Sequence, residues 1–451
     1  MQGKIKLTLL VGIFCQITLL AQPKDNSPIT RYGLGDLYRG DFNQTGATGG
    51  LFGAWVDPYR VNPVNPASMP FLQSTSLEFG FFSRYNAYRR NNSEENVWSG
   101  NLDYISLAFP LKSRINEALE PSTSPWDFAM GVQVTPFSQV GYDVEFTQYI
   151  QDIDTIENIF TGQGGLSQAS WSGGAKYKNL SFGVQAGYVF GRITNNSQLD
   201  LLSQDAAYST RNFNSFNLRG FTWLAGLMYR VPLDPEQKGV VGAERQRRWI
   251  NIGAYGGSPT NYNTRTVELI ERVNLAYSSG GSVARDTLVF NEDASGKGTL
   301  PGRFGAGVTL QKGDIYQVGF NAEVRAWEGF NLTNKQEIGL SFRNAYRVSV
   351  GGEWTPDAGS FKRYLRRIRY RAGMFYEQDP RVIDGKNMDG LGLQLGFGFP
   401  VILPRQQVSF LEFAVEAGRR GDLSIQQDNY IRLRLAATLN DNSWFFKRKY
   451  N

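Results

Sequence analysis

The chain has 451 residues, and its formal net charge of +6 is spread over short basic runs, which does not indicate a nucleic-acid-binding protein. A mean hydropathy of −0.35 argues against helical membrane spans but allows a β-barrel, in which only every second residue meets lipid. The sequence has no histidine, and its single cysteine, Cys15, lies in a predicted leader, so we expect no enzymatic centre, no cofactor and no metal site.

The first 21 residues are predicted to be a secretory signal. Lys4 and Lys6 supply the positive charge, a mostly apolar run follows, and Ala21 precedes a plausible cleavage point. A lipoprotein anchor at Cys15 is the alternative, but apolar residues continue after it. A transmembrane helix would need a longer apolar run, of about 20 residues.

Residues 22–73 do not resemble barrel wall. Glycines and prolines recur throughout this segment, and no ten-residue alternation of polar and apolar side chains appears. Irregular backbone of this kind cannot face lipid, because its polar groups would be unpaired. The segment also carries aromatic side chains that need burial. We therefore predict an N-terminal hatch or plug in the lumen over residues 22–73, with a flexible periplasmic tail as the alternative.

Alternation begins at residue 74 and predicts an all-β fold, a transmembrane antiparallel β-barrel of about 14 strands over residues 74–451. An even number of strands places the N-terminal and C-terminal ends of the barrel segment in the periplasm, with short turns on that side and longer loops on the outer side. The basic runs at 245–248 and 362–367 then lie on the periplasmic side, where solvated turns are the simplest interpretation. Long outer loops are predicted over residues 148–164, 194–212, 261–301 and 379–387, the third with room for a small hairpin.

The closing strand, Tyr430–Leu439, shows the alternation most clearly. Ile431 and Leu433 fall on one face, whereas Arg432 and Arg434 fall on the other. An arginine facing lipid at mid-membrane would cost about 2–4 kcal/mol. The two arginines are therefore predicted to face the lumen.

Other strands of the C-terminal half also direct charged side chains inward. Because opposite signs fall on neighbouring strands, we interpret them as a luminal charge ladder that fills the barrel and holds the plug. A path for a substrate or an ion is the alternative. The predicted ladder consists of Glu323, Arg325, Arg347, Glu353, Arg369, Arg371, Glu412, Glu416, Arg432 and Arg434.

Two short motifs stand out before and within the first strands. Asn65-Pro66-Ala67-Ser68, in the predicted plug, is a turn signal. Pro136, followed by Phe137, lies in the middle of the long third strand, where proline cannot donate to a ladder. It predicts a break or bulge in the barrel wall, with a bend at the membrane edge as the alternative.

In their order along the chain, these features resemble the FadL/TodX-type outer-membrane transport family, in the divergent form found in Bacteroidetes. The resemblance rests on the Asn65-Pro66-Ala67 motif, a plug of about fifty residues before some fourteen strands, and Pro136 in the third strand. The segments from Ser27 to Asp36 and from Leu439 to Lys449 are similar to the same group. The resemblance covers nearly the whole mature chain and extends to the PorV-type barrel group of type IX secretion.

The resemblance implies an outer-membrane barrel with an N-terminal hatch, in which Asn65, Pro66, Ala67 and Ser68 are the hatch motif. It also implies an apolar luminal site and lateral exit of substrates at a kinked third strand, where Pro136 lies. This chain departs from that pattern because the C-terminal half of its lumen is more charged than an apolar site requires.

The sequence is therefore compatible with two functions. The first is passive transport of hydrophobic, fatty-acid-like small molecules across the outer membrane by luminal binding and lateral release. The second is a non-transporting structural or scaffold subunit of an outer-membrane secretion or assembly machine, with other outer-membrane proteins as partners. An apolar pocket that reaches the wall at Pro136 favours the first, and a lumen filled by plug and ion pairs favours the second.

Overall fold

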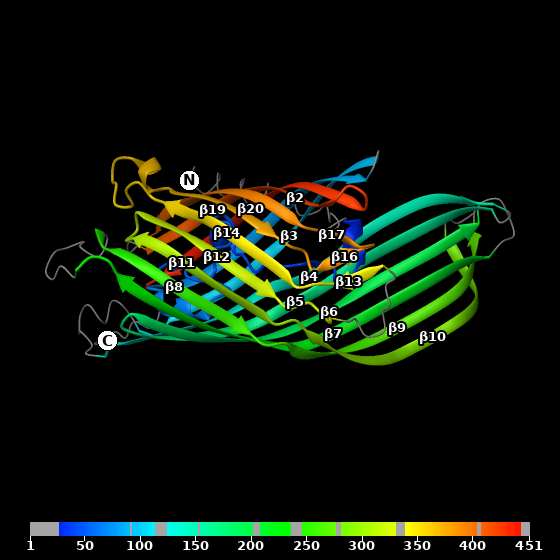
Figure 1. The fold of residues 1–451 in the computed structure, drawn as a ribbon, viewed down its shortest axis with the longest axis horizontal. Coiled ribbons are helices and arrows are strands. Elements are labelled where there is room, and N and C mark those ends of the chain that lie inside the picture. The colour runs from blue at the N-terminus through cyan, green and yellow to red at the C-terminus, as the bar shows by residue number, and fades with distance from the viewer. Residues whose placement is uncertain are drawn as a thin grey trace, which may run out of the picture.

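The computed structural model describes residues 27–90, 93–112, 124–151, 154–201, 208–235, 246–276, 281–330, 339–403 and 407–442. The predicted leader and the aromatic, basic tail from Trp444 onward lie outside these ranges. Fourteen antiparallel strands close into a barrel, which confirms the predicted fold class (Figure 1).

The wall strands follow chain order, and the last, β20, closes the barrel on the first, β2. Two wall strands are each divided into two segments. One consists of β8 and β9, which both pair with β7. The next consists of β10, which pairs with β9, and β11, which pairs with β8. The wall consists of β2 (Thr75–Arg90), β3 (Ser93–Pro110), β4 (Trp126–Ile150), β5 (Asp154–Tyr177), β6 (Leu180–Leu201), β7 (Ser209–Pro232), β8 (Arg248–Gly257), β9 (Thr260–Ala276), β10 (Gly281–Leu300), β11 (Arg303–Lys312), β12 (Tyr316–Arg325), β14 (Ala345–Trp354), β15 (Arg369–Glu377), β18 (Gly390–Leu403), β19 (Gln407–Asp422) and β20 (Gln426–Asp441).

Short elements occupy the lumen and the connections. None of the helices in the described ranges has the length and apolar character to cross a membrane. Three of the short strands, β13, β16 and β17, form a small separate sheet between the outer ends of the wall strands. The short elements are η1 (Pro28–Arg31), β1 (Asp36–Leu37), α2 (Asn43–Gly46), η2 (Pro66–Phe71), β13 (Leu340–Phe342), η3 (Tyr364–Arg367), β16 (Arg381–Ile383) and β17 (Lys386–Asn387).

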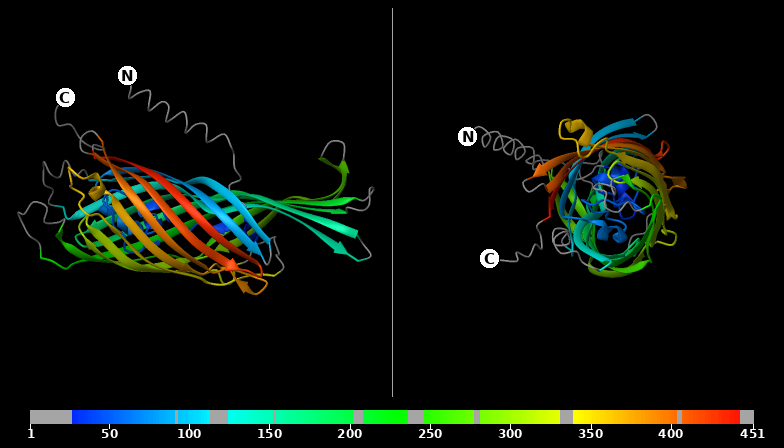
Figure 2. Two further views of the ribbon diagram at one scale, coloured as in Figure 1. Left: turned by 90° about the horizontal axis from the view of Figure 1, so that it is seen from above. Right: turned by 90° about the vertical axis from the view of Figure 1, so that its left-hand side faces the viewer.

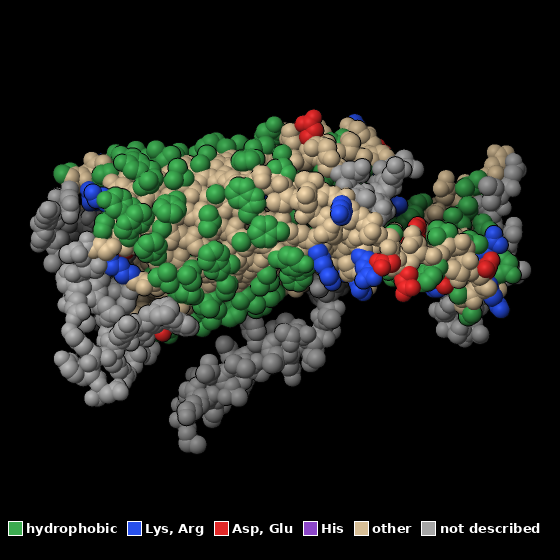
Figure 3. Space-filling view, turned by 90° about the horizontal axis from the view of Figure 1, so that it is seen from below, with side chains coloured by type: hydrophobic (Ala, Val, Ile, Leu, Met, Phe, Trp, Pro, Cys, Tyr) green, Lys and Arg blue, Asp and Glu red, His purple; other side chains and the backbone are tan. Residues whose placement is uncertain are grey.

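Side chains alternate across the wall as a membrane barrel requires. In β18, Leu393 is 59% exposed, whereas the next residue, Gln394, is 2% exposed. In β20, Arg434 is buried while Leu435 faces outward. Hydrophobic side chains are spread over the face of the barrel that Figure 3 shows, and most of the charged ones lie toward the projecting end. This apolar outer band places the barrel in the outer membrane.

The strands from β4 to β7, with β9 and β10, run well past the rim formed by the other strands (Figures 1 and 2). The loops predicted over residues 148–164 and 194–212 are therefore wrong for most of their length, whereas the hairpin allowed for within 261–301 is present as β9 and β10, longer than expected. In these projecting parts both faces of the sheet carry polar residues, so the sequence does not alternate between polar and apolar side chains, although the strands remain paired. Within the described ranges, the register of the outermost strand, β10, is with β9 alone, and it shifts at three places.

Residues 27–73 lie inside the barrel, where Figure 2 shows them in dark blue when the barrel is viewed end-on. Phe42 and Phe52 are fully buried, and Phe42 stacks on Tyr104 of β3 with ring centroids 3.7 Å apart. Gly396 of β18 leaves the space that Ala47 occupies, because a Cβ there would lie 2.5 Å from the Ala47 methyl carbon. The segment is thus packed against wall strands on several sides.

Replacing Leu393 by arginine tests where the membrane band ends. At this lipid-facing position the change should lower the free energy of unfolding by about 2–4 kcal/mol. Leu288→Arg is the matched control, because Leu288 is also exposed but lies on the projecting strand β10 and should tolerate the charge. Denaturant titration in phospholipid vesicles measures both. Equal losses in the two variants would contradict a membrane band that stops at the rim.

Candidate functional site

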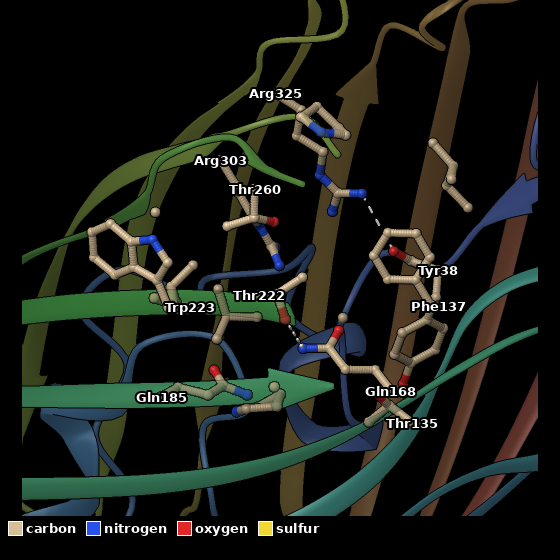
Figure 4. Close-up of a pocket in the computed structure, with 18 of the residues that line it drawn as sticks. Tyr38, Thr135, Phe137, Gln168, Gln185, Thr222, Trp223, Thr260, Arg303 and Arg325 are labelled. Atoms are coloured by element: carbon tan, nitrogen blue, oxygen red, sulfur yellow. Dashed lines mark hydrogen bonds between the residues drawn. The ribbon is translucent and has the colours of Figure 1, made fainter. Parts of the chain in front are cut away.

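A cavity of about 140 Å³ lies between the N-terminal segment and the wall (Figure 4). One side is formed by Tyr38 and Pro63 of the N-terminal segment, and the other by residues of β4 to β9, β11 and β12. Aromatic and aliphatic side chains supply much of its lining. The apolar lining residues include Leu37, Val64, Phe137, Trp223, Leu224 and Trp327.

Several polar groups in the cavity wall have hydrogen-bond or ion-pair partners. Gln168 Nε2 donates to Thr222 Oγ1 at 3.1 Å. Arg325 Nε donates to Glu323 Oε1 at 2.8 Å, and its Nη1 donates to the Tyr38 carbonyl at 3.3 Å. Arg303 donates to Glu323 Oε2 at 2.6 Å. Glu323 and carbonyls of the N-terminal segment therefore already engage both guanidinium groups.

The cavity reaches an interruption in the barrel wall. Strand β3 pairs with β4 only from Pro110 to Ile105, whose partner is Val134. Beyond that point β4 continues to pair with β5 on its other side, with a bulge between Pro136 and Ser138. The hydrogen-bonded ladder between β3 and β4 therefore stops at Val134, two residues before Pro136. Proline favours such a stop because it has no backbone N–H to donate.

The N-terminal segment covers this interruption from inside. Its short strand β1 pairs with β4, so that Asp36 lies opposite Gln139 and Leu37 opposite Ser138. A further hollow of about 320 Å³ lies at the same interruption, with Leu102 of β3 and Pro136 among its lining residues. Pro136 therefore lines both the luminal cavity and the hollow between β3 and β4.

The Asn65-Pro66-Ala67-Ser68 motif begins η2 and is fixed to the wall. Asn65 Nδ2 donates to the Gly53 carbonyl at 2.5 Å, and Asn65 Oδ1 accepts from the Ala67 amide at 3.1 Å. Ser68 Oγ donates to the Asn65 carbonyl at 2.8 Å. A Cβ at Gly226 of β7 would lie 2.0 Å from Asn65 Oδ1, so this glycine allows the close approach. None of the four motif residues lines the cavity, whereas the two residues before the motif, Pro63 and Val64, do.

The predicted ladder residues face carboxylates and guanidinium groups of the N-terminal segment. Arg60, fully buried, contacts Glu412 of β19 and Asp57 of its own segment, and lies 3.4 Å from Glu353. Arg371 joins the same cluster by contacting Glu353 at 2.6 Å and also Glu412. The cluster therefore ties the segment to β14, β15 and β19.

Further ion pairs repeat this arrangement nearer the outer end. Arg434 contacts Asp41 at 2.9 Å, and Arg39 contacts Glu416 at 2.6 Å. Arg432 instead contacts Asp103 of β3 at 3.1 Å. In each pair a strand residue is matched by a charge that lies far away in the sequence.

The other four predicted ladder residues also have partners. Arg369 contacts Asp57 at 2.9 Å, and Arg325 contacts Glu323 at 2.8 Å. Arg347 donates to the Gly49 carbonyl at 3.0 Å and lies over the ring of Phe375. All ten ladder residues therefore contact either the N-terminal segment or a neighbouring wall strand.

Sequence reasoning missed the charges that the N-terminal segment contributes: Asp36, Arg39, Asp41, Asp57 and Arg60. Burial would raise the pKa of Asp57, but Arg60 and Arg369 outweigh it and hold that pKa at about 2. Asp41 likewise has a lowered pKa, since Arg434 and Arg39 outweigh the effect of burial. A usable signal was the presence of charges in a segment predicted to be buried, because buried charges need partners.

Within the described ranges, no group of three or more histidine, cysteine, aspartate or glutamate side chains is arranged to hold a metal ion. The ionic clusters instead pair carboxylates with guanidinium groups, as in the contact of Arg60 with Asp57. Their chemistry is that of structural cross-links, and the absence of a cofactor stays a prediction.

Comparison with known proteins agrees with a barrel of the predicted kind. A family model described as BamG matches residues 4–451. A Pseudomonas aeruginosa FadL homologue has a similar structure, with a TM-score of 0.55 and 13% identity over 90% of this chain and 100% of that chain. The Pseudomonas putida toluene transporter TodX has a TM-score of 0.53 and 13% identity over 90% and 99% of the two chains. No curated protein matches the sequence.

The resemblance to FadL/TodX-type barrels is confirmed by these structures at the level of the fold. An identity of 13% carries no information on what this chain binds.

Replacing Arg60 by methionine tests whether the buried cluster holds the N-terminal segment in place. Removing one partner from a buried ion cluster costs about 3–5 kcal/mol, because carboxylates are left unpaired. We expect R60M to unfold at lower denaturant concentration and to expose the segment to protease. R248M is the control, since Arg248 pairs with Asp234 on the surface. Protease resistance equal to that of the unchanged protein would rule out this anchoring role.

Proposed function

Because this chain belongs to the BamG family and has the fold of FadL and TodX barrels, we propose that it is a passive outer-membrane channel for small hydrophobic molecules. Substrate binds in the luminal cavity and leaves sideways, into the membrane, beside Pro136. The observation that carries this proposal is that one residue, Pro136, borders both the cavity and the interruption between β3 and β4. No chemical conversion is part of this function.

The cavity supports a substrate smaller than a fatty acid. Its volume of about 140 Å³ is close to that of an engineered protein cavity that binds benzene. Arg303 and Arg325, which would be the groups to bind a carboxylate, are already engaged by Glu323. We therefore favour a neutral molecule about the size of one aromatic ring over the fatty-acid-like substrate that the family resemblance implies.

We propose residues 22–73 as the hatch, with a fixed part and a moving part. The fixed part is the Asn65–Ser68 motif, which is hydrogen-bonded internally and packed on Gly226. The moving part is β1, which pairs with β4 at only two positions. Opening the interruption to the cavity would require release of these two pairs, of the Tyr38 amide from the Phe137 carbonyl, and of the ion pairs of Asp36 with Arg381 and Arg420, while the motif holds the rest of the segment.

A second candidate is the structural or scaffold subunit of an outer-membrane machine. Two observations favour it: ion pairs fill the C-terminal half of the lumen, and a long sheet projects beyond the rim, where another protein could contact it. Under this proposal the partners are other outer-membrane proteins. The two candidates are distinguished by what the protein retains when it is extracted from its membrane.

Filling the cavity tests the channel. Gly187 of β6 lines the cavity, and a Cβ there would lie 2.4 Å from Gln168 Nε2, so G187F should occlude the space. We expect uptake of toluene by proteoliposomes to fall about tenfold, because the binding site is lost. G173F is the control: its new ring points to the lipid side, beside Trp171. Uptake that is equal in both variants would refute luminal passage.

Native mass spectrometry of the protein extracted gently from its own membrane compares the two candidates. Apolar adducts of low mass that disappear in G187F are expected for the channel. Stoichiometric protein partners that persist in G187F, without such adducts, would instead establish the scaffold and contradict the channel.

A further inference from the structure

The loop between β14 and β15 carries an unusual exposed surface. Phe361 is 100% exposed and Leu365 is 69% exposed. Between and beside them, Lys362, Arg363 and Arg366 are also exposed. Among the ion pairs of the described residues, none involves these three cations. Exposed apolar side chains interleaved with unpaired cations indicate a surface that binds something both apolar and anionic.

The loop has a defined shape that presents these side chains outward. Its ends are joined by the Asp357 amide, which donates to the Arg366 carbonyl at 2.8 Å. Tyr364 Oη donates to the Pro400 carbonyl of β18 at 3.2 Å, and Tyr370 Oη donates to the Leu365 carbonyl at 3.0 Å. The loop is thereby held against β15 and β18, and η3 lies outside the barrel wall (Figure 2).

This place is the membrane interface at the periplasmic end of the barrel. The outward side chains beside the loop are aromatic: Trp354 lies 5.8 Å from Tyr370, which lies 5.9 Å from Phe397, centroid to centroid. Such aromatic belts sit at the level of lipid headgroups. The first and last wall strands begin and end at this same end, together with short turns such as Lys178-Asn179, which identifies it as periplasmic.

We propose that residues 361–366 bind anionic phospholipid headgroups of the periplasmic leaflet. Lys362, Arg363 and Arg366 contact the phosphates, while Phe361 and Leu365 enter the boundary between headgroups and acyl chains. Each cation close to an anionic lipid surface contributes to the binding free energy, and the apolar side chains contribute further by burying apolar area. The loop thus anchors one side of the barrel to lipid of a particular charge, independently of whether the lumen transports anything.

A fluorescent reporter on the loop tests this proposal directly. Cys15 is the only cysteine of the sequence, so S360C in a C15A background gives one labelling site beside Phe361. The label is bimane, and the protein is placed in nanodiscs of phosphatidylcholine with or without phosphatidylglycerol. We expect a blue-shifted emission that is larger with phosphatidylglycerol, because the label enters the interface.

Removing the charges should abolish that difference. In K362Q/R363Q/R366Q, the affinity for phosphatidylglycerol, titrated by native mass spectrometry in mixed micelles, should fall about tenfold or more. The control R219Q/R272Q/R285Q removes three exposed arginines at the opposite end and should leave the affinity unchanged. Retained heat-modifiable migration on gels shows that both variants are folded.

Three results would overturn the proposal. One is an emission that does not depend on phosphatidylglycerol, which would mean that the loop is only solvated. Another is an equal loss of affinity in the control triple variant, which would mean that net charge alone binds lipid. The third is polyglutamate shifting the label in phosphatidylcholine discs as much as phosphatidylglycerol does, which would indicate an acidic protein as the ligand.

Discussion

The buried charges of the C-terminal strands constrain the whole molecule. An arginine such as Arg434 can face only the lumen, and in the lumen it needs a carboxylate, which Asp41 of the N-terminal segment supplies. Arg60 reverses the arrangement by bringing a cation from the segment to Glu412 of the wall. Neither part satisfies its charges alone, so the segment and the strands that surround it are electrostatically interdependent.

The two sides of the lumen differ as a result. Against β14 to β20 the N-terminal segment is joined by ion pairs. Against β4 to β8 it meets glycines and neutral amides such as Gly187 and Gln168, and there it leaves a cavity, which Arg303 and Arg325 border from β11 and β12. The wall is interrupted on that neutral side, at Pro136. The N-terminal segment is therefore attached by charges on one side of the lumen and borders open space on the other.

The sequence predicts the lipid-facing strands well because lipid imposes a strict alternation, as in Tyr430–Leu439. It predicts the projecting strands poorly, because water on both faces removes that alternation while hydrogen bonding continues. The sequence predicts that the charge ladder meets the N-terminal segment, but not which residues pair with each other. Asp57 and Arg369 are 312 residues apart, and an irregular backbone has no period from which the direction of a side chain follows. The break in the wall at Pro136 could be predicted because the lack of a backbone N–H is a property of proline itself and needs no knowledge of its partners.

The unpaired side of β10 has a consequence for how this protein behaves at the cell surface. A long free strand edge invites identical molecules to add strands and grow into aggregates. Here the three register shifts of β10 bend that edge, and charged residues such as Arg285, Asp286 and Glu292 interrupt its apolar runs. Both features make this edge a poor template for strand addition by an identical molecule, although the sheet projects far beyond the rim.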